Sequence, residues 1–115
     1  MRKETYNIVL APIAANPGDK LIRRGDMDCV LKSIEGYTFR HGGLAFGVTN
    51  KSPNATIQHY WTVTELKSGY VCAHGATRRA AIVATLSEPL IKQLRDHLQH
   101  INNSANPGLI PWVLI

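Results

Sequence analysis

The chain has 115 residues, a length that suits one domain better than two. Hydrophobic residues make up 44% of it and charged residues 18%, which is the composition of a folded globular protein and excludes an intrinsically disordered one. Thirteen Lys and Arg against eight Asp and Glu leave a net charge of +5. That charge permits contact with phosphate groups without requiring it.

Targeting and redox signals are weak. Asn16 and Pro17 interrupt the apolar stretch at residues 8–15, so no secretion signal is expected. No stretch reaches the roughly 20 apolar residues that a membrane-spanning helix needs. Two cysteines, Cys29 and Cys72, are too few for a disulfide framework. We therefore expect a cytoplasmic protein with reduced thiols and no membrane contact.

The first half of the chain predicts mainly β-strands, separated by turns that contain glycine or proline. The signal is a run of β-branched and apolar residues in each segment. Pro12 indicates a strand end or an edge position. Gly47 indicates a bulge or a close approach of another backbone. The candidate strands are residues 6–14, 29–34, 37–40 and 44–49.

This half also contains one predicted hairpin turn and one segment whose secondary structure is ambiguous. Glu35 and Gly36 are expected to form a hairpin turn between two of the candidate strands. Residues 20–32 fit either a strand or a short helix that begins at Asp26, because periodicity cannot decide over so few residues.

The second half begins with a predicted β-hairpin. Residues 59–66 alternate between two faces, with Trp61 and Val63 on the same one. Turn chemistry at residues 67–69 then leads to an antiparallel return strand over residues 70–74.

Two helices are predicted to follow. Thr77 is a good N-cap for residues 78–86, because its hydroxyl can accept a hydrogen bond from a free amide of the first turn. Pro89 inside a continuous helix would cost about 3 kcal/mol, so a second helix is expected to start there with Ser87 as its cap. The apolar residues of this second helix form one stripe, which needs a sheet face to cover it. The stripe consists of Leu90, Ile91, Leu94, Leu98 and Ile101.

These elements predict an α+β fold, in which an antiparallel sheet of four to six strands carries one or two C-terminal helices on one face. We expect a single domain over residues 1–115 that ends in an apolar tail at about residues 104–115. Such a tail is expected either to pack back on the domain or to bury itself in a second copy. The second alternative is favoured, so a homodimer formed by strand or tail exchange is predicted. The tail residues assigned to this interface are Leu109, Ile110, Trp112, Val113, Leu114 and Ile115.

Arginines supply the candidate anion or partner site. Arg78 and Arg79 stand in the first turn of the first predicted helix, where the helix dipole disfavours cations by about 0.3–1 kcal/mol. Free amides and guanidinium groups together suit a phosphate, a nucleic-acid backbone or an acidic partner, and Thr77 belongs to the same site. Arg23 and Arg24 are further candidates. The simpler alternative is that these side chains extend into solvent or pair with nearby acids.

Metal binding and catalysis have little support. Cys72 and His74 share one face of the predicted return strand. His97 and His100 share one face of the second helix, and zinc ligands would converge if that helix lay over the strand. Each residue is ordinary at its position, so we predict no metal and no cofactor. With no nucleophile elbow, phosphate-binding loop or metalloprotease motif, no catalytic residue is assigned.

One segment carries a resemblance. A Trp-x-Val-x-Glu strand and a Ser-Gly turn precede a Gly-x-Thr helix start, as in small proteins of phages and plasmids. Residues 75–82 are similar to the strand-to-helix turn of HicB-like antitoxins, over less than a quarter of the chain. Arg78 and Arg79 depart from that family, which has acidic residues there. The resemblance implies a bacterial or phage origin.

The sequence therefore predicts a small non-enzymatic binding or accessory protein of bacterial or phage type. It would act through protein–protein contact and would associate with itself. The alternative is a nucleic-acid-binding protein that uses a basic surface around Arg78 and Arg79.

Overall fold

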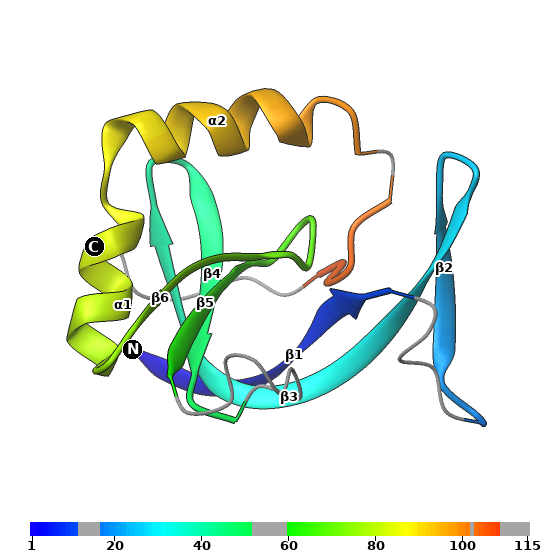
Figure 1. Cartoon of the computed structure of the whole chain (residues 1–115), viewed down its shortest axis with the longest axis horizontal. Coiled ribbons are helices and arrows are strands. Elements are labelled where there is room, and N and C mark those ends of the chain that lie inside the picture. Colours follow the sequence, from blue (N-terminus) through cyan, green and yellow to red (C-terminus); the bar gives the residue numbers. More distant parts are fainter. Residues whose placement is uncertain (12–16, 52–59, 102, 109–115) are drawn as a thin grey trace.

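The computed structural model describes residues 1–11, 17–51, 60–101 and 103–108. It contains a six-stranded antiparallel sheet with two C-terminal helices packed against it, which confirms the predicted α+β class (Figure 1). In chain order the elements are β1 (Arg2–Leu10), β2 (Lys20–Arg24), β3 (Met27–His41), β4 (Leu44–Thr49), β5 (Trp61–Glu65), β6 (Val71–Gly75), α1 (Arg78–Thr85) and α2 (Glu88–Leu98).

Strand β3 organises the sheet. It is 15 residues long and pairs with β1, β2 and β4. β1 runs along one side of it, while β2 and β4 pair with its two ends on the other side. β5 and β6 extend the sheet beyond β4. Figure 1 shows that β3 is strongly bent along its length, so the sheet is curved.

The predicted hairpin turn at Glu35 and Gly36 is wrong, because both residues lie inside β3. Gly36 does not have the positive φ of a turn glycine. A Cβ at Gly36 would instead collide with the carbonyl oxygen of Val48 and stand 2.9 Å from the hydroxyl of Tyr6. Glycine is required at this position because neighbouring groups approach closely, and the chain does not turn there.

Glycines with positive φ mark the turns that do reverse the chain. Gly42 and Gly43, with φ of 60° and 79°, join β3 to β4, as a two-residue hairpin turn with positive φ at both positions requires. Gly25, with φ of 60°, joins β2 to β3. This second hairpin settles the ambiguity of residues 20–32: they are strands, and no helix begins at Asp26.

Strand β1 covers a different range from the predicted one. It begins at Arg2. Its first residues are polar and carry no strand signal, but residues 2–4 pair with residues 36–38 of β3. It ends at Leu10, and the predicted continuation through Pro12 lies outside the described residues.

Both predicted helices are confirmed. The Thr77 hydroxyl accepts a hydrogen bond from the amide of Ala80 at 3.0 Å, and α1 then ends at Thr85. α2 has Pro89 in its first turn, while Ser87 at the cap position makes no side-chain capping bond. Neither helix in the described part of the chain has the length and apolar character needed to cross a membrane.

The helices cover a hydrophobic core on one face of the sheet. The predicted stripe contributes Ile91, Leu98 and Ile101 to it, and Leu94 packs against it half-buried. Trp61 packs against the same cluster, so the stripe and the β5–β6 hairpin contribute to one core. The helix with extensive contacts to β5 and β6 is α1, whereas Arg95 of α2 bonds to Gly42 in the β3–β4 turn. The buried members are Phe39, Leu44, Phe46, Val48, Val63, Ala81, Ile91, Leu98 and Ile101.

A second cluster lies on the opposite face, around Tyr6. Tyr6 pairs with Ile34 of β3, whose side chain points away from that of Phe39 because side chains alternate along a strand. The Tyr6 ring lies across Gly47, where a Cβ would stand 2.5 Å from the ring atoms Cε1 and Cζ. The close approach predicted at Gly47 is therefore real, although the neighbour is a side chain and not a backbone. Tyr6, Ile8 and Leu66 form the buried part of this cluster.

The segment after α2 closes the curved sheet. Asn7 of β1 donates its amide to Oδ1 of Asn106 at 2.6 Å. Nδ2 of Asn106 donates to the carbonyl oxygens of Asn7 at 2.9 Å and Leu66 at 2.8 Å. β1 also meets the β5–β6 turn directly, because the amide of Val9 donates to the carbonyl of Gly69 at 2.8 Å. Ala105 adds two further bonds, since its carbonyl accepts from Nδ2 of Asn7 at 3.0 Å and its amide donates to the carbonyl of Lys67 at 2.9 Å. Hydrogen bonds of Ala105, Asn106 and Gly69 therefore join the two ends of the sheet.

Candidate functional site

The four residues whose spacing would suit zinc are not gathered into a metal site in the described part of the chain. Within the described ranges, no group of three or more His, Cys, Asp and Glu side chains could hold a metal ion. The ring of His74 stands edge-on to that of Tyr60, with centroids 5.7 Å apart. Cys72, His74, His97 and His100 thus do not bring four ligands to one point.

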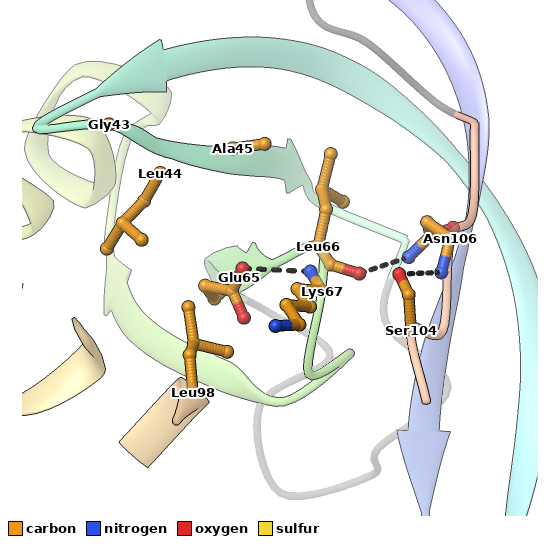
Figure 2. A pocket seen from close by; sticks show the side chains of 9 residues that line it. All are labelled: Gly43, Leu44, Ala45, Glu65, Leu66, Lys67, Leu98, Ser104 and Asn106. Carbon is orange, nitrogen blue, oxygen red and sulfur yellow. Dashed lines mark hydrogen bonds between the residues drawn. The ribbon is translucent and has the colours of Figure 1, made fainter. Parts of the chain in front are cut away.

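A pocket of about 350 Å³ opens beside the β5–β6 turn, near the end of α2 (Figure 2). Glu65 is its buried acid, with 1% of its surface exposed. Its two carboxylate oxygens accept hydrogen bonds from the amides of Lys67 at 2.8 Å and Ser68 at 2.7 Å. The carboxylate therefore holds the shape of the turn. The lining consists of Gly43, Leu44, Ala45, Glu65, Leu66, Lys67, Leu98, Ser104 and Asn106.

Cys72 lies close enough to Glu65 to be affected by its charge. Burial raises the pKa of the Cys72 thiol to about 12, and the negative charge of Glu65 adds to the rise. The thiol also donates to the carbonyl oxygen of Val63, with Sγ 3.5 Å from the oxygen. A thiol with so high a pKa stays protonated at neutral pH, so Cys72 is poorly suited to act as a nucleophile.

The start of α1 presents the two arginines of the predicted anion site. Arg78 and Arg79 are both exposed. The guanidinium carbon of Arg78 lies 5.0 Å from the ring centroid of Tyr37, a distance at which cation and ring attract each other. The Thr77 hydroxyl accepts the capping bond from the amide of Ala80, which leaves its own O–H as a possible donor.

A recess next to Tyr37 combines aromatic and basic side chains. It has a volume of about 230 Å³, and its lining includes Tyr37, Trp61, Lys3 and Lys51. Glu35 lies between the two lysines, 3.1 Å from Nζ of Lys3 and 3.9 Å from Nζ of Lys51. Together with Arg78, the recess carries three cations and one acid around two rings. We call it the Tyr37–Trp61 recess.

Arg23 and Arg24 lie at the other end of the molecule. Figure 1 shows the β2–β3 hairpin and α1 on opposite sides, so these arginines do not join Arg78 and Arg79 in one surface. Arg23 pairs with Asp28 at 3.6 Å, and both side chains are more than half exposed. Arg24 is partly buried and bonds to the segment after α2.

The outer edge of β6 is the sheet edge with no charge. In the part of the chain that the structure describes, β6 pairs with β5 alone. Its five residues, Val71–Gly75, include no Lys, Arg, Asp or Glu. Tyr60 is 45% exposed and Val71 is 39% exposed, and His74 is exposed as well. We call Tyr60, Val71 and His74, together with the free edge of the strand, the β6 edge surface.

The other outer strands carry many charges. The charged residues of β1 and β2 are Arg2, Lys3, Glu4, Lys20, Arg23 and Arg24. Sequence reasoning missed the β6 edge surface because no residue in Val71–Gly75 is chemically unusual. The signal that was available is the lack of the charges that usually protect an edge strand.

The predicted tail interface is untested. Leu109, Ile110, Trp112, Val113, Leu114 and Ile115 all lie outside the described residues.

Comparison of the chain with protein-family models, with curated protein sequences and with solved structures finds no match. The resemblance of residues 75–82 to HicB-like antitoxins stays a prediction.

Proposed function

We propose that this chain is a small non-enzymatic binding protein that acts through protein–protein contact and associates with itself by pairing β6 with β6 of a second copy. The observation that supports this most directly is the β6 edge surface, in which a strand that pairs on one side only, among the described residues, stands beside exposed Tyr60 and Val71. An edge strand offers a row of hydrogen-bonding groups that a partner strand can complete.

Charge favours a second copy as the occupant. The chain has a net charge of +5, so two copies repel each other unless they meet where charge is low. β6 has no formal charge, whereas all the charged residues of β2 are basic and would repel one another across a pair of β2 strands. A two-fold arrangement also makes the contact self-complementary, because each β6 presents the same residues to the other.

The test is the oligomeric state of the full chain by sedimentation velocity over a range of concentrations. The wild type is expected to form a dimer. Val71→Lys places a charge on the edge and is expected to give a monomer with an unchanged circular dichroism spectrum. Leu21→Lys is the matched control, since Leu21 is 53% exposed on β2 and its replacement should leave the dimer intact.

Two outcomes would overturn the proposal. One is a wild type that stays monomeric at high concentration. The other is a dimer that survives Val71→Lys but is lost when residues 109–115 are deleted, since the tail would then be the interface. If Val71→Lys fails to fold, Tyr60→Lys tests the same surface from outside the strand.

A second candidate is single-stranded nucleic-acid binding at the Tyr37–Trp61 recess, extended by Arg78 and Arg79. The supporting observation is the combination of two rings with Lys3, Lys51 and Arg78 around one recess. Aromatic faces stack on bases and cations contact the phosphate backbone, which is how non-specific single-strand binding is built.

Fluorescence anisotropy with a labelled single-stranded oligonucleotide tests this second candidate. Affinity should fall steeply as salt rises, and it should fall further in the double variant Arg78→Ala/Arg79→Ala. Arg23→Ala, at the far end of the molecule, is the control that should bind normally. The absence of binding at low salt would contradict this candidate.

A cytoplasmic location and a bacterial or phage origin belong to the same proposal. The support for the location is that Cys29 and Cys72 are both free, as thiols are in a reducing compartment.

A further inference from the structure

A small cavity lies between the β2–β3 turn and the segment that follows α2. Its volume is about 70 Å³, and its lining is strongly basic. Arg23, Arg24 and His100 contribute side chains to it, and none of its described lining residues is acidic. The full lining is Arg23, Arg24, Gly25, His100, Ile101 and Asn103.

The guanidinium group of Arg24 is held in place by contacts on three sides. Nε donates to Oδ1 of Asn103 at 3.1 Å, and Nη2 donates to the carbonyl oxygens of Asn103 at 3.3 Å and Lys67 at 3.4 Å. The Tyr70 ring covers one face, with its centroid 5.0 Å from Cζ. The remaining nitrogen, Nη1, is buried and has no hydrogen-bond partner among the described residues.

Nη1 of the Arg24 guanidinium group therefore lacks a hydrogen-bond acceptor among the described residues. A buried donor without a partner costs about 1–3 kcal/mol, and more when the group is charged. Water would leave the positive charge of Arg24 uncompensated, since no acid pairs with it among the described residues, whereas Arg23 already pairs with Asp28. An anion in the cavity would compensate the charge of Arg24, and basic residues on several sides of a cavity suit a tetrahedral oxyanion better than a planar carboxylate.

The size of the cavity agrees with such a ligand. The volume of about 70 Å³ is several times the roughly 15 Å³ that one water molecule needs, so the cavity has room for a small polyatomic ion. A phosphodiester inside a nucleic-acid strand would need room for two further ester chains.

We propose that the cavity lined by Arg24, Arg23 and His100 binds a tetrahedral oxyanion, namely phosphate, either free or as the terminal group of a small phosphomonoester. The site is independent of the β6 edge surface and of the Tyr37–Trp61 recess. By joining the β2–β3 turn to the segment after α2, bound phosphate would also stabilise the closure of the sheet.

The test is an NMR titration of the full chain that follows the arginine Nε–Hε resonances, with sodium phosphate added at constant ionic strength against sodium chloride. The Arg24 signal is expected to shift saturably with phosphate and not with chloride. Phenyl phosphate in place of phosphate tests the monoester source. Arg24→Gln should weaken phosphate binding by about tenfold or more, measured as a phosphate-dependent rise in the melting temperature. Arg40→Gln, at an exposed arginine outside the proposed sites, is the matched control and should leave binding unchanged.

Arg24→Gln also removes hydrogen bonds to Asn103, so it has a structural effect of its own. His100→Gln changes the lining without touching those bonds and should weaken binding several-fold while the protein stays folded. The proposal is wrong if phosphate causes no saturable shift of Arg24, or if Arg24→Gln and His100→Gln respond to phosphate as the wild type does. A shift of Arg24 with a single-stranded oligonucleotide but not with phosphate or phenyl phosphate would also overturn it.

Discussion

At the scale of single residues, the ring of Tyr6 lies so close to Gly47 that a side chain at residue 47 would collide with it. Gly47→Ala adds one methyl group against the Tyr6 ring, where no space exists. We expect a loss of about 1–3 kcal/mol in the free energy of unfolding, as is usual for overpacking, measured by urea denaturation. Tyr6→Leu in the same chain should recover part of the loss. Equal losses with and without Tyr6→Leu would show that the two sites are not coupled.

Cys72 makes stability depend on pH at the alkaline end. The folded protein holds the pKa of this thiol near 12, against an ordinary value of 9.0, because the thiol is buried and close to Glu65. A raised pKa means that the stabilisation is complete below about pH 9 and is lost as the pH rises toward 12. Cys72→Ala should therefore flatten the decline above pH 9, by up to about 1.4 kcal/mol per pH unit.

Denaturation curves of both proteins from pH 7 to pH 11 provide the measurement. Between pH 7 and 8 the two should differ by a constant amount, which serves as the internal control. Burial raises the pKa of Tyr6 as well, so part of the decline remains in the variant. Parallel curves over the whole range would show that the thiol of Cys72 does not titrate differently in the folded state.

At the scale of secondary-structure elements, the two helix caps provide a matched pair. The Thr77 side chain accepts from the amide of Ala80, whereas Ser87 makes no capping bond. Thr77→Ala should cost about 1 kcal/mol and Ser87→Ala less than about 0.5 kcal/mol in chemical denaturation. Equal losses for the two variants would contradict the observed difference in capping.

Closure of the sheet depends on Asn106. Asn106→Ala removes three hydrogen bonds that tie β1 to the end of β5, so we expect a loss of about 2–3 kcal/mol. Asn50→Ala, at an exposed position, is the matched control and should stay within about 0.5 kcal/mol of the wild type. A comparable loss in both variants would show that the closure contributes little.

Local signals explain why the helices and the β5–β6 hairpin could be predicted from sequence. A cap, a proline in the first turn and an apolar stripe all lie within a few residues of the elements that they define. Gly36 carries no such local signal, because the neighbours that require a glycine there are Tyr6 and Val48, distant in sequence. The closure by Asn106 joins residues 99 positions apart and was missed for the same reason.

The candidate sites also depend on contacts between residues that are distant in sequence. The charge of Arg24 predicts an anion-binding residue, but the contacts with Asn103 and Tyr70 that fix its guanidinium group arise only from the fold. Arg23 and Arg24 were grouped with Arg78 and Arg79, and the fold places the two pairs at opposite ends. Composition shows that cations are present, and topology decides which of them share a surface.

At the scale of the whole molecule, the arrangement of charge limits how copies can meet. Basic residues occupy the β1 and β2 edges, whereas β6 has none. A protein with a net charge of +5 therefore has one uncharged sheet edge among those described, and the same end carries exposed Tyr60 and Val71. This contrast is the basis for placing self-association at β6.

Amide hydrogen exchange at increasing protein concentration tests that claim most directly. Pairing of two β6 strands would protect outward-facing amides within Val71–Gly75, and it would do so more strongly as the concentration rises. Amides of β2 should exchange at rates that do not change with concentration. Exchange in β6 that is equally independent of concentration would contradict the proposed interface.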